Sequence, residues 1–237
     1  MNKIFSTAIV VAGLSFSTAA FSASCADINY VSSNNPKGTD YPLKGVATPY
    51  NHDADWNYSG EIAGFATSTG YLDSDEYNYQ DFKWRAKTSV TFPQRGPNWI
   101  TVFDPVTELT HCNNVFVQEK PKATNPTLNV TSNGSSAYVS LNYEIDSYSK
   151  AARNNDGVTT TFYWEHNGSG ILNAAGSVHR TSLSGSASRY INFPSTAGTY
   201  SFSASVSDGT YKTTLFLGTY VVQGGGTTPP CPTCEVP

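Results

Sequence analysis

Residues 137 to 145 read AYVSLNYEI, and this stretch decides the fold class of the protein. Its apolar and polar side chains alternate strictly, which is typical of a β-strand with one buried face. One face carries only hydrophobic residues, namely Ala137, Val139, Leu141, Tyr143 and Ile145. The stretch therefore predicts a strand of a sheet that covers a hydrophobic core.

The same alternation recurs along residues 126 to 222. GTYSFSASVSDG, residues 198 to 209, ends in Asp208-Gly209, a pair that favours a hairpin turn. TTTFYWEHNG and SRYINFP are two further alternating stretches, and a last strand is expected over residues 214 to 222. The positions expected to face the core are Tyr200, Phe202, Ala204, Val206, Phe162, Trp164, Ile191 and Phe193. Short strands over about 100 residues, with a Trp on a middle strand, predict an immunoglobulin-like β-sandwich.

Residues 126 to 222 also resemble a known group of domains. WEHNG at residues 164–168, and GTY at 198–200 leading to VSDG at 206–209, resemble the polycystic-kidney-disease (PKD) and immunoglobulin-like domains of secreted bacterial proteins. The resemblance covers less than half of the chain. It implies a sandwich that acts as a spacer or a binding unit, not as a catalyst.

Residues 24 to 122 predict a second, less regular sandwich. DFKWRAKTSVTF, residues 81 to 92, alternates in the same way, and further strands fit GEIAGFAT, NWITVF and NVFVQ. KPKATNP, residues 120 to 126, is expected to be a hinge because its prolines stop strand pairing. The expected fold class is all-β, with two tandem immunoglobulin-like β-sandwich domains and a flexible Gly/Thr/Pro tail at residues 223–237.

The N-terminus predicts export. Residues 1–23 have the layout of a secretory signal peptide, with cleavage expected after Ser22 or after Ala23. Their apolar part is too short for a membrane span. A lipid anchor on Cys25 is an alternative, although the large aliphatic residue that it requires at position 22 is absent. We expect a secreted protein that is extracellular or on the cell surface, with the periplasm as an alternative.

The composition narrows the classes of partner that the protein is expected to bind. Charged residues make up 14% and aromatic residues 13% of the chain, and the net charge is -4. Binding to nucleic acid requires concentrated Lys and Arg, so this balance argues against it. No stretch predicts a transmembrane segment.

The four cysteines of an exported chain favour disulfides, and sequence alone allows three pairings. Cys25 lies at the start of the first domain and Cys112 near its last strand, so a bond between them would close a long loop. Cys231 and Cys234 lie in the tail. They predict a local disulfide loop, an intermolecular bond, or the remnant of a linker to another domain.

Two acidic segments suggest a calcium site. NHDADWNYSGE, residues 51 to 61, begins like a calcium-binding loop, but Tyr58 and Gly64 stand where the EF-hand pattern requires Gly and Glu. YLDSDEYNY, residues 71 to 79, would supply further carboxylates. The expected ligands are Asp53, Asp55, Asn57, Asp73, Asp75 and Glu76. The alternative is a pair of solvated loops whose Asp and Asn residues form turns.

The same segments suggest a glycan-binding surface, because aromatic faces stack on sugar rings while neighbouring polar groups bind the hydroxyls. The aromatic candidates are Trp56, Tyr58, Tyr71, Tyr77 and Tyr79. Lys83, Arg85 and Lys87 alternate on one expected strand and would bind an anionic polysaccharide or an acidic partner. The alternatives are core positions for the aromatics, and a cationic stripe that keeps a sheet face or edge soluble.

Catalytic motifs are absent from the sequence. It contains no G-x-S-x-G, H-E-x-x-H or P-loop. The histidines, His52, His111, His166 and His179, are scattered, and His166 is expected to face solvent. We therefore expect a non-enzymatic protein that binds extracellular polysaccharide. The alternatives are an accessory part of a polysaccharide-degrading enzyme, and an adhesive protein that binds a protein partner by strand addition.

Overall fold

The structure is a computed structural model that describes residues 24–223, with gaps at 32–33, 55–63, 68–69, 73–75, 81–82, 105–106 and 132–133. At residues 27, 54, 64, 70–72, 76–80 and 83–85 it describes the backbone alone. The signal peptide and the tail with Cys231 and Cys234 lie outside the described residues.

The described chain is almost entirely antiparallel β-structure, as the alternating sequence predicts. A short 3₁₀ helix, η1 (Cys25–Asp27), precedes the strands, and one short helix, α1 (Lys150–Asn154), lies among them. The first group of strands comprises β1 (Ala47–Ala54), β2 (Gly64–Thr67), β3 (Gly70–Leu72), β4 (Glu76–Gln80), β5 (Lys83–Thr91), β6 (Gly96–Asp104) and β7 (Leu109–Val117). The second group comprises β8 (Lys122–Val130), β9 (Ser136–Glu144), β10 (Val158–His166), β11 (Asn173–Arg180), β12 (Ser184–Asn192), β13 (Gly198–Ser207) and β14 (Lys212–Val222).

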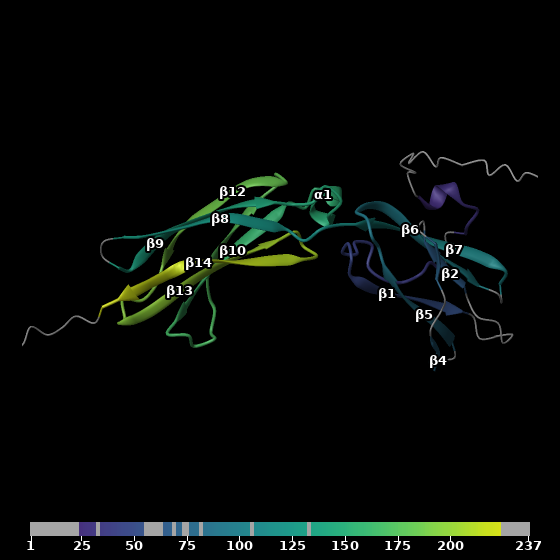
Figure 1. The fold of residues 1–237 in the computed structure, drawn as a ribbon, viewed down its shortest axis with the longest axis horizontal. Coiled ribbons are helices and arrows are strands. Elements are labelled where there is room, and N and C mark those ends of the chain that lie inside the picture. Colours follow the sequence, from purple (N-terminus) through teal and green to yellow (C-terminus); the bar gives the residue numbers. More distant parts are fainter. Residues whose placement is uncertain are drawn as a thin grey trace, which may run out of the picture.

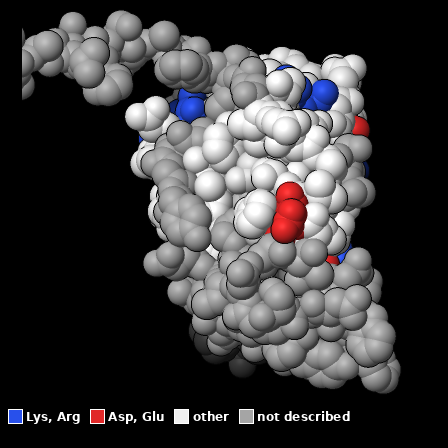
Figure 2. Space-filling view, turned by 90° about the vertical axis from the view of Figure 1, so that its right-hand side faces the viewer, with Lys and Arg blue, Asp and Glu red and all other residues white. Residues whose placement is uncertain are grey.

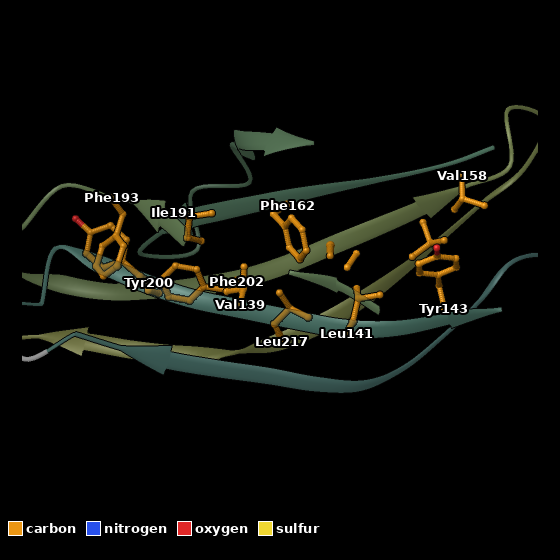
Figure 3. Close-up of a cluster of buried hydrophobic side chains, with 14 of the residues drawn as sticks. Val139, Leu141, Tyr143, Val158, Phe162, Ile191, Phe193, Tyr200, Phe202 and Leu217 are labelled. Carbon is orange, nitrogen blue, oxygen red and sulfur yellow. The ribbon is translucent and has the colours of Figure 1, made fainter. Parts of the chain in front are cut away.

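The second group forms the C-terminal sheet pair, with strand orders β12-β9-β8 and β11-β10-β13-β14. The first, second and fifth strands of the group thus share one sheet, and the other four share the second. Two facing antiparallel sheets connected in this way form an immunoglobulin-like sandwich, which confirms the predicted fold class. The expected inward residues of β9 and β13 are all buried, and Figure 3 shows their side chains meeting between the sheets.

Tyr200 fixes one corner of this sandwich. It lies near the start of β13, and its hydroxyl donates a hydrogen bond to the carbonyl of Thr196, four residues earlier (3.2 Å). This contact is the tyrosine corner found in many immunoglobulin-like domains. His166 stacks on the same ring (centroids 4.6 Å apart) and is half-buried, so the expectation that it faces solvent is wrong. Trp164 is also only half-buried, although it packs against the core.

The first group forms the N-terminal sheet pair, with strand orders β1-β5-β4 and β3-β2-β6-β7. Its core is a separate hydrophobic cluster that includes Tyr50, Phe65, Phe92 and Ile100. Before β1, Val31 forms a parallel bridge with His111 and Leu43 forms one with Gln118, whereas Lys37 pairs with Asn51 of β1. This arrangement also suits an immunoglobulin-like sandwich, whose leading strand crosses to pair with the last one.

A disulfide bond joins Cys25 of η1 to Cys112 of β7, and their Cα atoms are 5.8 Å apart. The predicted pairing of these cysteines is therefore confirmed. Both residues are buried, and the backbone N–H of Cys25 also donates to the side-chain oxygen of Asn114 (2.7 Å). The bond fastens the beginning of the described chain to the last strand of the N-terminal sheet pair.

The two sheet pairs lie at opposite ends of an elongated molecule, with α1 near their junction (Figure 1). Strand β8 already begins at Lys122, so most of residues 120–126 is strand and not hinge. The prolines do disturb pairing as expected, but only locally, because the register shifts between Thr124 and Thr127. At this junction, the carboxylate of Asp146 accepts a hydrogen bond from the backbone N–H of Glu119 (2.9 Å).

Candidate functional site

Most of the predicted calcium ligands lie outside the described residues. Asp55, Asn57, Asp73 and Asp75 lie outside the described residues, and only the backbone of Glu76 is described. Asp53 is buried, and its carboxylate forms an ion pair with the ammonium group of Lys37 (2.5 Å). A calcium site in these segments stays a prediction.

The predicted glycan-binding aromatics divide between two sheets. Trp56 and Tyr58 lie outside the described residues. Tyr71 lies on β3, which belongs to the β3-β2-β6-β7 sheet, whereas Tyr77 and Tyr79 lie on β4 of the facing sheet. Only the backbone of these three tyrosines is described, so their role as a binding surface also stays a prediction.

The basic stripe lies on β5, the middle strand of its sheet, between β1 and β4. The alternative was that the stripe keeps a sheet face or edge soluble, and the edge is wrong, because residues 83–87 pair with β4 and residues 84–91 pair with β1. The register places Asp53 opposite Arg85 and Glu76 opposite Lys87, while Lys83 lies opposite Gln80. Acidic residues thus face two of the three cations across the strands, which weakens the stripe as a site for anions.

The structure brings together three titratable residues that the sequence left scattered. His52 of β1, Asp104 at the end of β6 and His111 of β7 are 0%, 1% and 3% exposed. Nε2 of His52 lies 3.2 Å from Oδ2 of Asp104, and the two imidazole rings have centroids 5.1 Å apart. We call these residues the buried His-Asp-His cluster. The sequence signal was weak: His52 follows the inward positions Thr48 and Tyr50 at a period of two.

Burial dominates the electrostatics of His52. Desolvation lowers its pKa below the usual value, against the opposing effect of the hydrogen bond and charge of Asp104. The other imidazole, His111, lowers the pKa further, and the backbone of Asn34 raises it slightly. His52 is therefore neutral at pH 7, and a neutral imidazole has a ring nitrogen lone pair to offer a metal ion.

A second candidate surface is the outer face of the β12-β9-β8 sheet, which we call the outer tyrosine face. Tyr138 of β9 and Tyr190 of β12 are direct cross-strand partners, and their rings lie 5.1 Å apart. Tyr190 is 69% exposed, more than any other large hydrophobic residue of the described chain. The two rings are tilted by 55° against each other, and together they form an apolar platform on the sheet face.

A shallow hollow of about 670 Å³ continues this face toward the other end of β9. Its polar lining comes from all three strands of the sheet: Lys122, Thr124, Asn142, Glu144, Ser184 and Ser186. Lys122 and Glu144 form an ion pair across the strands (3.7 Å), so the lining carries no net charge. Asn142 is four residues from Tyr138, which places it about 13 Å along the strand from the tyrosine platform.

Figure 2 shows the end of the molecule formed by the N-terminal sheet pair. Among the described residues in this view, Lys, Arg, Asp and Glu form only small, separate patches. None of the helices in the described part of the chain is long and apolar enough to cross a membrane.

Comparison with known proteins gives neither a family nor a curated relative. No family model matches the chain, and no curated protein matches it. Solved structures with similar folds include domains A168–A170 of titin, at 12% identity and a TM-score of 0.41. The match covers 78% of this chain, which spans 61% of the titin chain.

Two receptor structures show the same kind of similarity. A cytokine receptor complex matches at 9% identity and a TM-score of 0.39, covering 81% of this chain and 98% of that one. The chicken interferon gamma receptor alpha chain matches at 12% identity and a TM-score of 0.28, covering 80% and 97% of the two chains. These similarities are distant, and the assignment of an immunoglobulin-like fold rests on the strand order described above.

Proposed function

We propose that the protein is a secreted, non-enzymatic protein of two immunoglobulin-like domains that binds a neutral polysaccharide through the outer tyrosine face. The observation that carries this proposal is the exposed Tyr190 beside the half-buried Tyr138, on the same sheet face as a polar hollow. Sugar rings stack their C–H faces on aromatic rings, and their hydroxyls bind polar side chains. The outer tyrosine face offers both kinds of contact along one line of strands.

The charge of the hollow supports a neutral ligand. Lys122 and Glu144 neutralise each other, and the remaining polar lining consists of hydroxyl and amide groups. Hydroxyls and amides both donate and accept hydrogen bonds, as sugar hydroxyls do. A strongly anionic polymer would instead require a surplus of Lys or Arg.

The proposal also includes the export of the protein and its division into two domains. The Cys25–Cys112 disulfide supports export, because such bonds persist in oxidising compartments. Separate hydrophobic cores in the two sheet pairs support two domains, with the boundary near residues 118–122.

Glycan-array binding of the mature protein, followed by titration with the best neutral polysaccharide, tests the proposal. We expect Tyr190→Ala to weaken binding about 5- to 150-fold, which corresponds to about 1 to 3 kcal/mol for one lost stacking contact. Tyr30→Ala is the matched control, because Tyr30 is an exposed tyrosine of the N-terminal part and should have no effect. Trp56→Ala tests the alternative surface in the N-terminal loops.

Two outcomes would refute this assignment. If Trp56→Ala abolishes binding and Tyr190→Ala leaves it unchanged, the ligand binds at the N-terminal loops. If no glycan binds, a protein partner becomes the better hypothesis. That alternative has its own support in β14, an edge strand on which Phe216 and Val221 are exposed, because exposed edge strands accept added strands.

A further inference from the structure

We propose that the buried His-Asp-His cluster of His52, Asp104 and His111 binds one divalent transition-metal ion, with zinc as the best fit. The site is separate from the outer tyrosine face and does not depend on polysaccharide binding. It also differs from the predicted calcium site, whose ligands are carboxylates and an amide.

The three residues of the cluster come from three strands, and their ligand atoms lie close together. One candidate ligand atom from each residue lies within 4.8 Å of the other two. Two ligands at zinc-bonding distance and a tetrahedral angle are about 3.3 Å apart. Nε2 of His52 and Oδ2 of Asp104 are already 3.2 Å apart, which matches this separation. The ligand atom of His111 lies within 4.8 Å of the other two, so it would have to move closer for all three residues to bind one ion.

The ligand atoms of the cluster indicate which metal ion would bind. Two imidazole nitrogens and one carboxylate oxygen suit zinc and neighbouring transition metals, whereas calcium and magnesium prefer oxygen alone. The carboxylate of Asp104 is held in place from its other oxygen, Oδ1, which accepts a hydrogen bond from the backbone N–H of Thr107 (3.4 Å).

The position of the cluster indicates what the ion would do. His52 lies on β1 of one sheet, whereas Asp104 and His111 lie on β6 and β7 of the facing sheet. An ion bound to all three would join the two sheets through the core. Its role would therefore be to stabilise the N-terminal sheet pair, beside the disulfide that already fastens β7.

The test uses the full mature chain with Cys231→Ser and Cys234→Ser, so that the cysteines of the tail cannot bind metal. After treatment with a chelator, the protein is dialysed against zinc and its metal content is measured. We expect one zinc ion per chain, and an increase in Tm of about 5 °C or more at a hundredfold excess of zinc over Kd. Asp104→Asn, which keeps the size of the side chain, should weaken zinc binding at least tenfold.

His179→Asn is the matched control, because His179 is an exposed histidine of β11 and should not affect binding. Circular dichroism establishes whether each variant is folded. If Asp104→Asn does not fold, the protein with the unaltered site is loaded with cobalt and its absorption spectrum is measured. Intense visible bands would show that the cluster binds the ion, since nitrogen ligands in a tetrahedral site produce such bands. The absence of zinc binding, full binding by folded Asp104→Asn, or a cobalt spectrum identical to that of the aquo ion would each overturn the proposal.

Discussion

Removal of the Cys25–Cys112 disulfide should destabilise the N-terminal sheet pair and leave the C-terminal sheet pair unchanged. The bond closes a loop across a sequence separation of 87 residues. In the chain-entropy model, a loop of this length contributes about 4.6 kcal/mol by restricting the unfolded chain. Typical domains are stable by about 5 to 15 kcal/mol, so the loss would leave this part of the protein only marginally folded.

The perturbation is the double substitution Cys25→Ala and Cys112→Ala. Alanine is preferred to serine because both positions are buried, and a buried hydroxyl without a partner would add its own cost. Guanidinium denaturation followed by tryptophan fluorescence measures the effect. Trp164 lies in the C-terminal sheet pair and Trp99 in the N-terminal one, so Trp164→Phe in the same background assigns the signal to the first sheet pair.

The wild-type protein with its disulfide reduced serves as the control and should lose the same free energy of unfolding as the double variant. A loss below about 2 kcal/mol would refute the loop-closure reasoning, because it would mean that the unfolded chain is already restricted. An equal loss of the free energy of unfolding in the C-terminal sheet pair would refute the proposal that the two sheet pairs fold as independent domains.

Two further predictions concern single aromatic residues. Tyr50→Phe removes the hydrogen bond from the buried hydroxyl to the carbonyl of Thr39 (2.8 Å) and should cost about 1 kcal/mol at pH 7. Burial raises the pKa of Tyr50, with smaller contributions from Asp40 and Tyr211, so above pH 10 the unfolded chain ionises first and wild-type stability falls by up to about 1.4 kcal/mol per pH unit. Denaturation between pH 9 and pH 11 should show a shallower fall for the variant, and parallel curves would contradict the reasoning. Trp164→Ala should cost about 2 kcal/mol, since the side chain is half-buried, and a cost above 4 kcal/mol would show that it lies in the core.

Local pattern was sufficient to predict several strands, but not β1, β3 and β4, because the acidic segments that overlap them were interpreted as loops. In β9 and β13 the side chains alternate at a period of two, and this period depends only on the backbone geometry of a strand. The same pattern predicted the buried positions, because a half-buried strand has one apolar face. The predicted disulfide also followed from the order of the chain, since its cysteines lie at the two ends of one folded unit.

The predictions that failed concern the ends and edges of elements. Trp164 and His166 follow the inward pattern of β10, but both are only half-buried in the structure. The basic stripe was interpreted in part as an edge, yet β5 lies between two neighbours that come from distant segments of the chain. Neither property is encoded in the residues of the strand itself.

The sequence by itself determined the alternating strands and the all-β class and favoured one disulfide, because each depends on the period or order of residues along the chain. Only the tertiary structure decided that His52, Asp104 and His111 meet, since these residues come from three strands in two facing sheets. The Tyr138–Tyr190 pair likewise required the register between β9 and β12. Contacts between distant segments depend on how sheets pair and pack, and a one-residue change in register would move these side chains to the opposite faces.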